Sequence, residues 1–533
     1  MGGRLHLGDL SQVMAARYGD RVLVEAADGR VGPLDRLRWT GRALHEDVRH
    51  LAAAWRAARF PTGATVLLVL ENRADVVVVL LALCRAGLVP APVNPLLKRE
   101  EIQAVAEATG ALGAVVDLAR LDLVRNAMGS VRIAVMDGEA DGTFDVSGWR
   151  FGHPGARAPK GRLDPQKTAI YLTTSGTTGR PKAAALTSRG LLAPFAVVAA
   201  LPLGRIRAPR GERDRLLSSL PLSHAMGLTA MLGCLSAGVR WMHLPHFRAE
   251  KVLDAIERLR ANVFVGVPTM YADMETAGAA VRNLSTVQLW ISAADRMSED
   301  RARRFQQYGA MVMLAGRPMG PAAFVDIYGM VELSGPAAIR LFLPSPRGMS
   351  LRTPFRLLPG MEARTVDTHG GATGFGRVGE LQFCGVGVLR EYRGYARAGP
   401  DAEGWFSSGD HGQVWPGKLF TFAGRHRDRL KVGGFSVFPA EVEAVLLDHP
   451  NVFEVALVGV PDDRIGERPV AVVVPSGPAF DEEAFLEWAR EQVAGYRRPR
   501  EVVVVDALPH GPNRKLDRDA ATEMAVEALA RRA

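Results

Sequence analysis

The sequence of 533 residues contains little cysteine and no long apolar run. Its three cysteines, Cys84, Cys234 and Cys384, lie far apart and form no C-x-x-C pair, which argues against a disulfide framework and against a zinc site. The longest apolar run, residues 76–84, is much shorter than the roughly 20 residues of a membrane-spanning helix, so it predicts a buried helix. The N-terminus also lacks the apolar core of a secretion signal. We therefore expect a cytoplasmic protein with no transmembrane segment.

The net charge of +9 comes without a basic tract, because arginine is scattered along the whole chain. No zinc-finger spacing or aromatic RNA-binding signature accompanies the charge, so we expect no nucleic-acid partner. A small phosphate-rich ligand and a solvated basic surface explain the charge equally well.

A chain of this length is expected to contain two or more domains. Its first half alternates β-branched runs with helical stretches, which predicts a mostly parallel sheet with helices on both faces. The expected strands are residues 65–70, 113–117, 169–173, 215–219, 239–244 and 262–267, and the first helices are residues 74–86 and 100–109.

The pattern changes after residue 370, where residues 379–384 and 419–422 look like antiparallel strands separated by glycine-rich turns. A smaller α/β unit is expected to begin near residue 428. Its expected elements are strands at 452–460, 469–474 and 501–505, a helix at 481–493 and a closing helix from Asp519.

The most informative segment is residues 171–182, YLTTSGTTGRPK. Glycines let the backbone turn with its N–H groups inward, and hydroxyls add donors for phosphate oxygens. Lys182 can bring a point charge to the same phosphates. A polar loop that leads from a strand into a helix explains any three of these residues but not the whole run. The residues that we expect to cradle phosphate are Thr174, Ser175, Gly176, Thr177, Thr178 and Gly179.

The run resembles the phosphate loop of the ANL superfamily, which includes acyl-CoA synthetases, peptide-synthetase adenylation domains and firefly-type luciferases. Further motifs follow in the family's order, so the resemblance covers nearly the whole chain. Residues 220–227, LPLSHAMG, match the second motif, and the resemblance places His224 beside the carboxylate pocket and the thiol channel.

Residues 328–332, YGMVE, resemble the family's nucleotide motif. The resemblance implies that Tyr328 stacks on adenine next to Gly329 and that Glu332 holds Mg²⁺, which prefers hard oxygen ligands. Thr177 is a second candidate ligand of the metal.

Two later motifs complete the nucleotide site and begin the C-terminal domain. In residues 404–410, GWFSSGD, the resemblance makes Asp410 the acceptor for the ribose hydroxyls. In residues 422–428, FAGRHRD, it places Arg425 at the ribose and Arg427 at the hinge.

The last motifs are those of the two half-reactions. Lys431, followed by Gly433 and Gly434, matches the segment where the pantetheine arm of coenzyme A approaches the backbone, an approach that suits residues without a Cβ. Lys515, in residues 508–518, falls at the catalytic lysine of the family.

The resemblance implies an α/β fold with two domains. Residues 1–426 would form a large domain of parallel and mixed sheets flanked by helices, with a β-barrel-like part, and residues 427–533 a small mobile α+β domain. The implied enzyme is an AMP-forming acyl-CoA ligase that uses ATP, Mg²⁺ and coenzyme A. Its substrate would be a hydrophobic carboxylic acid or the acyl-adenylate made from it, and the sequence leaves a homodimer open.

The departures from the family pattern concentrate on one half-reaction. Val331 replaces a threonine near the phosphates, residues 292–295 read SAAD where the family carries paired glycines, and Arg514 replaces the glycine before Lys515. We therefore hypothesise that adenylation is the impaired step.

Two alternatives remain open. A ligase that loads the thiol of a carrier protein shares all these motifs, and a lapsed homologue could bind nucleotide or acyl-adenylate without turnover. An amino-acid-activating domain is disfavoured, because residues 191–203 contain no acidic residue for the α-amine and, with residues 230–235, suggest an apolar acid.

Overall fold

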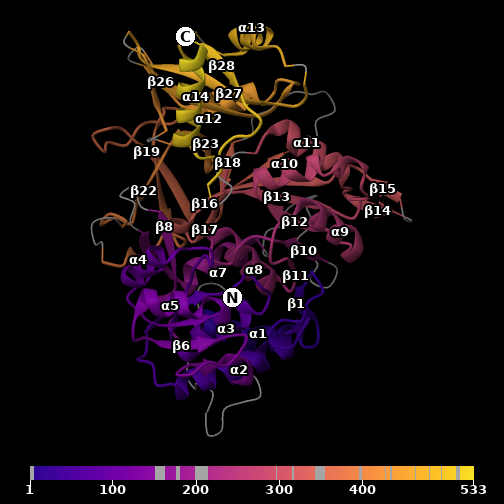
Figure 1. Ribbon diagram of the computed structural model, residues 1–533, viewed down its shortest axis with the longest axis vertical. Coiled ribbons are helices and arrows are strands. Elements are labelled where there is room, and N and C mark those ends of the chain that lie inside the picture. The colour runs from indigo at the N-terminus through magenta and orange to yellow at the C-terminus, as the bar shows by residue number, and fades with distance from the viewer. Residues whose placement is uncertain are drawn as a thin grey trace.

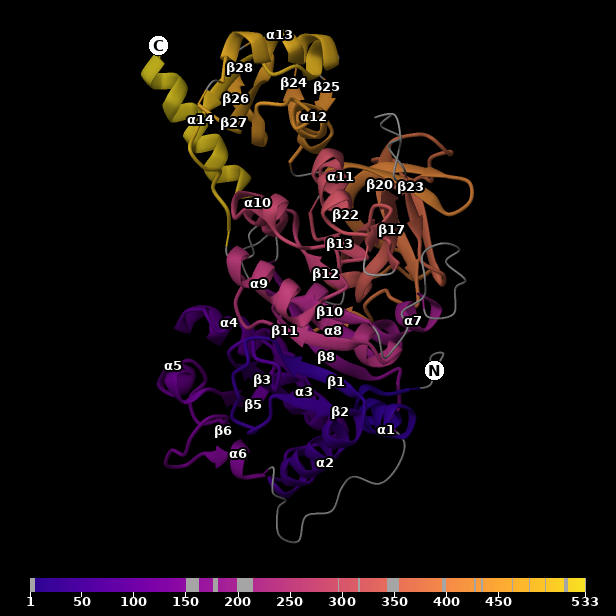
Figure 2. The ribbon, with the colours of Figure 1, turned by 90° about the vertical axis from the view of Figure 1, so that its right-hand side faces the viewer.

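The computed structural model describes residues 5–149, 163–175, 181–198, 214–295, 297–314, 317–342, 354–394, 399–425, 428–432, 435–462, 464–478, 480–493, 495–511 and 516–532. The chain up to residue 425 forms a large lower part, and the later residues form a smaller part above it (Figures 1 and 2). Within the described ranges, no helix combines the length and the apolar character that a membrane span needs.

A five-stranded parallel sheet forms the base of the molecule (Figure 1). Its order is β4 (Val89–Pro92), β3 (Thr65–Val69), β5 (Ala111–Val116), β6 (Arg132–Val135) and β7 (Phe144–Asp145). The longest apolar run forms α3 (Val76–Ala86), in which every residue except Arg85 is buried, as predicted. The other helices here are α1 (Leu7–Tyr18), α2 (Gly41–Ala57), α4 (Arg99–Thr109), α5 (Leu121–Met128) and α6 (Val146–Trp149), with the 3₁₀ turn η1 (Leu118–Arg120).

A second sheet of thirteen described strands changes from parallel to antiparallel at β16 (Ala323–Met330). Its parallel half runs β1 (Val22–Ala26), β11 (Arg240–His243), β10 (Arg215–Ser218), β12 (Val263–Gly266), β13 (Leu289–Ala293) and β16, with β2 (Arg38–Thr40) antiparallel at the edge. Its antiparallel half continues through β17 (Gly335–Phe342), β18 (Phe355–Leu357), β23 (Leu419–Arg425), β22 (Phe406–Trp415), β20 (Gly379–Gly385) and β19 (Met361–Val366). The parallel strands expected at 215–219, 239–244 and 262–267 and the antiparallel strands expected at 379–384 and 419–422 are therefore confirmed. The strand expected at 169–173 instead pairs antiparallel in a separate small sheet. The antiparallel strands expected in a barrel-like part extend the main sheet.

An aromatic core lies between the parallel half and the helices on one of its faces. Tyr271 packs edge-on against Phe305 at 4.8 Å between ring centroids, and Trp290 packs against Phe305 at 5.1 Å. The helices of this region are α8 (Ala225–Ala237), α9 (Ala249–Leu259), α10 (Pro268–Thr276) and α11 (Glu299–Tyr308), with the turns η2 (Ala279–Val281) and η3 (Val331–Leu333). The connection before Tyr328 contains a hairpin, β14 (Val312–Leu314) and β15 (Arg317–Met319), at the right of Figure 1.

The described residues on either side of the phosphate loop lie in a small antiparallel sheet with the order β21 (Glu391–Tyr392), β9 (Pro181–Thr187) and β8 (Thr168–Ser175). The first strand therefore extends two residues beyond the predicted end at Thr173. The chain then returns as a second strand before α7 (Ser188–Val198) begins. Hydroxyl-rich residues resemble a loop in sequence, but here the pairing with β9 keeps them extended.

The small C-terminal part is a sheet covered on both faces. Alternate residues of β26 (Val452–Asp462) point to opposite sides, so Leu457 joins one apolar cluster with Phe485 and Val458 joins another with Ala521. Its other elements are β24 (Leu430–Val432), β25 (Phe435–Val437), β27 (Gly466–Pro475), β28 (Glu501–Val504), α12 (Pro439–Leu446), α13 (Glu482–Gln492), α14 (Arg518–Arg532) and the turn η4 (Gly495–Arg497). The predicted α+β unit is confirmed.

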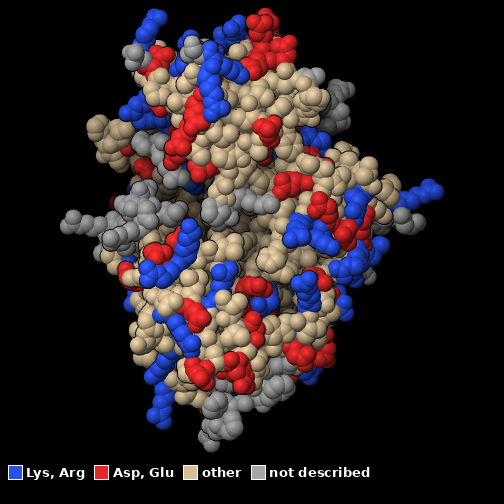
Figure 3. Space-filling model, in the orientation of Figure 1, with Lys and Arg blue, Asp and Glu red and all other residues tan. Residues whose placement is uncertain are grey.

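Charged side chains are dispersed over the face of the molecule drawn in Figure 3, where acidic and basic residues alternate. On this face the excess of basic residues gathers in no single patch, as the scattered arginines of the sequence suggest. All three cysteines are free, and Cys84 and Cys234 are buried.

Candidate active site

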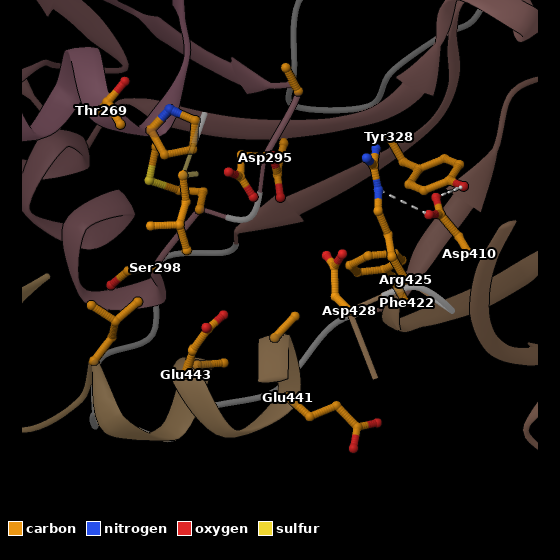
Figure 4. Close-up of a pocket in the computed structure, with 18 of the residues that line it drawn as sticks. Thr269, Asp295, Ser298, Tyr328, Asp410, Phe422, Arg425, Asp428, Glu441 and Glu443 are labelled. Carbon is orange, nitrogen blue, oxygen red and sulfur yellow. Dashed lines mark hydrogen bonds and ion pairs between the residues drawn. The ribbon is translucent and has the colours of Figure 1, made fainter. Parts of the chain in front are cut away.

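A cavity of about 1020 Å³ lies between the large and the small part of the chain. The wall that the large part supplies lies at the carboxyl ends of neighbouring parallel strands. Ala294 and Asp295 follow β13 there, and Tyr328 lies near the end of β16. The small part supplies α12, whose Glu441 and Glu443 are seen across the cavity in Figure 4. Ligands of open α/β sheets bind outside such strand ends, so this cavity is the candidate active site.

Three residues from separate motifs meet at the edge of this cavity. The Tyr328 hydroxyl donates to Oδ2 of Asp410 at 2.6 Å, and Nε of Arg425 lies 3.4 Å from Oδ1 of the same carboxylate (Figure 4). Asp410 and Arg425 face each other because β22 and β23 pair at these positions. Burial and the charge of Asp410 raise the pKa of Tyr328 well above its ordinary value, so its hydroxyl stays a donor. The Tyr328 ring packs among the rings of Phe355, Phe383, Phe420 and Phe422.

Residues 292–295, where the family carries paired glycines, contain a strained backbone. Ala294 has φ of +74°, in the left-handed region where a Cβ costs about 1–2 kcal/mol. This position lines the cavity directly after β13, whereas Ala293 is 1% exposed and belongs to the strand. The family's glycine preference therefore has a physical reason at Ala294, and this chain carries the strain.

A second group of motif residues gathers around a tyrosine that the sequence analysis missed. Thr174 and Lys182 face each other across β8 and β9, and Nζ of Lys182 lies 5.7 Å from the centre of the Tyr392 ring. The Tyr392 hydroxyl donates to Oε1 of Glu332 at 2.5 Å. Burial and the Glu332 charge raise the pKa of Tyr392, which keeps the phenol protonated. This group combines a cation, hydroxyls and a carboxylate, which fits a phosphate chain with its metal.

A buried ion pair in the cavity wall was also missed. Nη2 of Arg340 lies 2.7 Å from Oδ2 of Asp326, and the two side chains are 8% and 2% exposed. The two residues are directly opposite in the register of β16 and β17. A signal was present in the sequence, because Asp326 stands two residues before Tyr328 and so shares its face of the strand.

Gly329, predicted at the nucleotide, has a close backbone neighbour. A Cβ at this position would lie 2.1 Å from the carbonyl oxygen of Gly335, where β16 and β17 meet at an irregular register. Only glycine can lie this close to the Gly335 carbonyl. The close contact holds β16 against β17 directly after Tyr328.

Five of the predicted residues whose side chains the structure describes lie outside the lining of this cavity: Thr174, Lys182, Glu332, His224 and Lys431. His224 is the residue before α8, and its backbone N–H donates to the Pro221 carbonyl at 3.1 Å. Lys431 is exposed on β24, and its backbone N–H donates to Glu467 at 2.5 Å. The remaining predicted positions lie outside the described residues: Gly176, Thr177, Thr178, Gly179, Arg427, Gly433, Gly434 and Lys515, together with the side chain of Ser175.

The fold and this constellation define a class of protein. The sequence matches the family of AMP-binding enzymes over residues 12–393, and the C-terminal domain of AMP-binding enzymes over residues 441–515. The chain therefore belongs to the AMP-binding enzyme family and is an adenylate-forming ligase, as the motifs predicted.

Its relatives include CoA ligases of aromatic acids. The chain is 31% identical to indoleacetate–CoA ligase of Aromatoleum aromaticum over 89% of its length and 90% of that protein. It is 29% identical to 4-coumarate–CoA ligase 1 of Oryza sativa subsp. japonica, over 88% and 84% of the two chains. Its fold matches that of the anthranilate CoA ligase AuaEII with anthranoyl-AMP at a TM-score of 0.82, with 21% identity and coverage of 100% and 99%.

Proposed function

We propose that this chain joins a hydrophobic carboxylic acid to coenzyme A through an acyl-AMP intermediate. The observation that carries the proposal is the meeting of Tyr328, Asp410 and Arg425 at one cavity between two domains. They provide an aromatic wall, a buried carboxylate that can accept from ribose hydroxyls, and a cation. These are the groups that a nucleotide requires.

In the first half-reaction a carboxylate oxygen of the acid attacks the α-phosphorus of ATP, and pyrophosphate leaves. Such phosphoryl chemistry depends mainly on positioning and charge stabilisation. Thr174 and Lys182 would hold the phosphates, and Lys515 would approach the acid and the α-phosphate. Glu332, with Thr177 as a second candidate, would hold Mg²⁺, which neutralises phosphate charge when bound.

We assign the described arrangement of the domains to this first step. Gly511 and Leu516, which flank the segment of Lys515, line the cavity, whereas Lys431 does not. A contact between the domains supports the pose, because Arg301 of α11 donates to the Phe453 carbonyl at 3.4 Å and lies over its ring at 5.4 Å.

In the second half-reaction the small domain would turn about Arg427, so the domain boundary falls between residues 426 and 427. Lys431, Gly433 and Gly434 would then face the cavity, and the thiol of coenzyme A would attack the acyl carbonyl while AMP leaves. His224 would line the path between the two steps. Domain rotation of this kind is a known way to order half-reactions.

The acid is proposed to be apolar, and an aromatic acid is the first choice. The choice rests on two relatives that are ligases of indoleacetate and 4-coumarate by name, whereas Leu191 and Leu192 of α7 belong to the main apolar core. We retain the hypothesis that adenylation is the weaker step, which the strain at Ala294 and the missing hydroxyl at Val331 support.

The test measures both half-reactions separately. Pyrophosphate release is followed with ATP and a panel of acids, such as indole-3-acetate, 4-coumarate, anthranilate and octanoate. Thioester formation is followed from synthetic acyl-AMP and coenzyme A. The proposal expects thioester in the second assay, with weak pyrophosphate release in the first.

The other outcomes separate the alternatives. Brisk pyrophosphate release would contradict the hypothesis that adenylation is impaired. Transfer to a carrier-protein thiol but not to coenzyme A would favour the carrier-protein alternative. Binding of AMP or acyl-AMP without either reaction would identify a lapsed enzyme.

A further inference from the structure

A short strap of the chain, residues 389–393, crosses two segments of the phosphate site. Its first residue, Leu389, donates its backbone N–H to the carbonyl of Glu332 at 2.6 Å. Its later residues pair with β9, where Arg393 donates to the Ala183 carbonyl at 2.9 Å and Tyr392 lies opposite Ala184. The strap therefore joins the turn that carries Glu332 to the hairpin that carries Lys182.

Tyr392 brings its side chain to the point where these segments meet. Its hydroxyl donates to Oε1 of Glu332 at 2.5 Å. Its ring lies 5.7 Å from Nζ of Lys182. The residue is 7% exposed, so its orientation is fixed by packing as well as by these contacts.

We propose that Tyr392 is a positioning residue that orients the Glu332 carboxylate toward the metal of the bound ATP. The inference rests on the proposed function, in which Glu332 holds Mg²⁺. A carboxylate has two oxygens, and a donor that engages one of them fixes the plane in which the other is presented. Partners of this kind typically change metal affinity about 10- to 100-fold when they are removed.

The decisive variant is Tyr392→Phe, which keeps the ring beside Lys182 and removes only the hydroxyl. Binding of Mn²⁺ to the protein with ATP is measured by electron paramagnetic resonance, and binding of AMP without metal is measured by calorimetry. We expect Mn²⁺ affinity in the presence of ATP to fall at least tenfold, with AMP affinity within about twofold of the parent protein.

The matched control is Tyr171→Phe. Tyr171 lies on β8 in the same sheet, and its hydroxyl accepts from Arg393 of the same strap at 3.3 Å. It tests whether removal of any buried hydroxyl at the strap has the same effect. We expect Mn²⁺ affinity to stay within about twofold in this variant.

Several results would overturn the inference. They are an unchanged Mn²⁺ affinity in Tyr392→Phe, an equal loss of AMP and Mn²⁺ binding, or an equal loss in the Tyr171 control. A parent protein that fails to bind Mn²⁺ with ATP would instead overturn the proposed function, so the two failures are distinguishable.

Discussion

The parallel half of the large sheet reaches the cavity with its strand ends, whereas the antiparallel half reaches it with the faces of its strands. Ala294 and Asp295 stand where β13 stops, and their positions depend on backbone conformation. Asp410 and Arg425 are side chains held opposite each other by strand register. Substitutions that change backbone freedom should therefore affect the parallel half of the site, and substitutions that change charge pairing should affect the antiparallel half.

The largest effect is expected at the junction of the two halves. Arg340→Met would leave Asp326 buried without its cation, and breaking a buried pair in this way costs about 3–5 kcal/mol. We expect a large loss in the free energy of unfolding, measured by denaturant titration. The control is the double variant Arg340→Met/Asp326→Leu, which removes both charges and should recover most of the loss. A double variant as unstable as the single one would show that packing, not charge, matters here.

The next effect concerns the antiparallel side alone. Asp410→Asn would remove the charge that accepts from Tyr328 and pairs with Arg425. Loss of one preorganised group at such sites costs about 10²–10³ in rate. We expect pyrophosphate release to fall by this factor and AMP binding to weaken. Glu403→Gln is the control, because the exposed Glu403 side chain pairs with Arg364 at the surface, at 3.5 Å. Equal activity of the two variants would contradict the role of Asp410.

The smallest effect is expected in the parallel half, where the sign of the change in the free energy of unfolding is informative. Ala294→Gly should relieve the strain at φ of +74°, and glycine's larger unfolded-state entropy offsets part of the gain, so the net stabilisation is about 0.5–1 kcal/mol. The neighbouring control Ala293→Gly, inside β13, should instead destabilise by about 0.5–1 kcal/mol. Shifts of the same sign in thermal unfolding would contradict the comparison.

Much of the fold could be predicted from the sequence, because apolar runs and their spacing carry the information. The buried helix at Val76–Ala86 and the strands of the small domain follow from such patterns. The grouping of Tyr328, Asp410 and Arg425 followed from the resemblance of their motifs. It did not follow from spacing, since the residues are far apart along the chain.

The contacts that complete the site could not be predicted. Tyr392 meets Glu332 only because the strap at residues 389–393 crosses to β9, and no local pattern encodes this crossing. The left-handed conformation of Ala294 could not be predicted from its residue type either, because alanine does not indicate a positive φ. Extension of the strand beyond Thr173 was missed because pairing with β9 overrides the local preference of hydroxyl residues.

The hairpin of β16 and β17 has a consequence for the order of folding. Its strands are neighbours in sequence, and the turn between them carries Glu332. β16 and its parallel partner β13 must instead be brought together across the longer connection of residues 294–322, which is slower. We expect the hairpin to form early, so that the backbone positions of Glu332 and Tyr328 are already fixed relative to each other when the remaining sheet assembles around them.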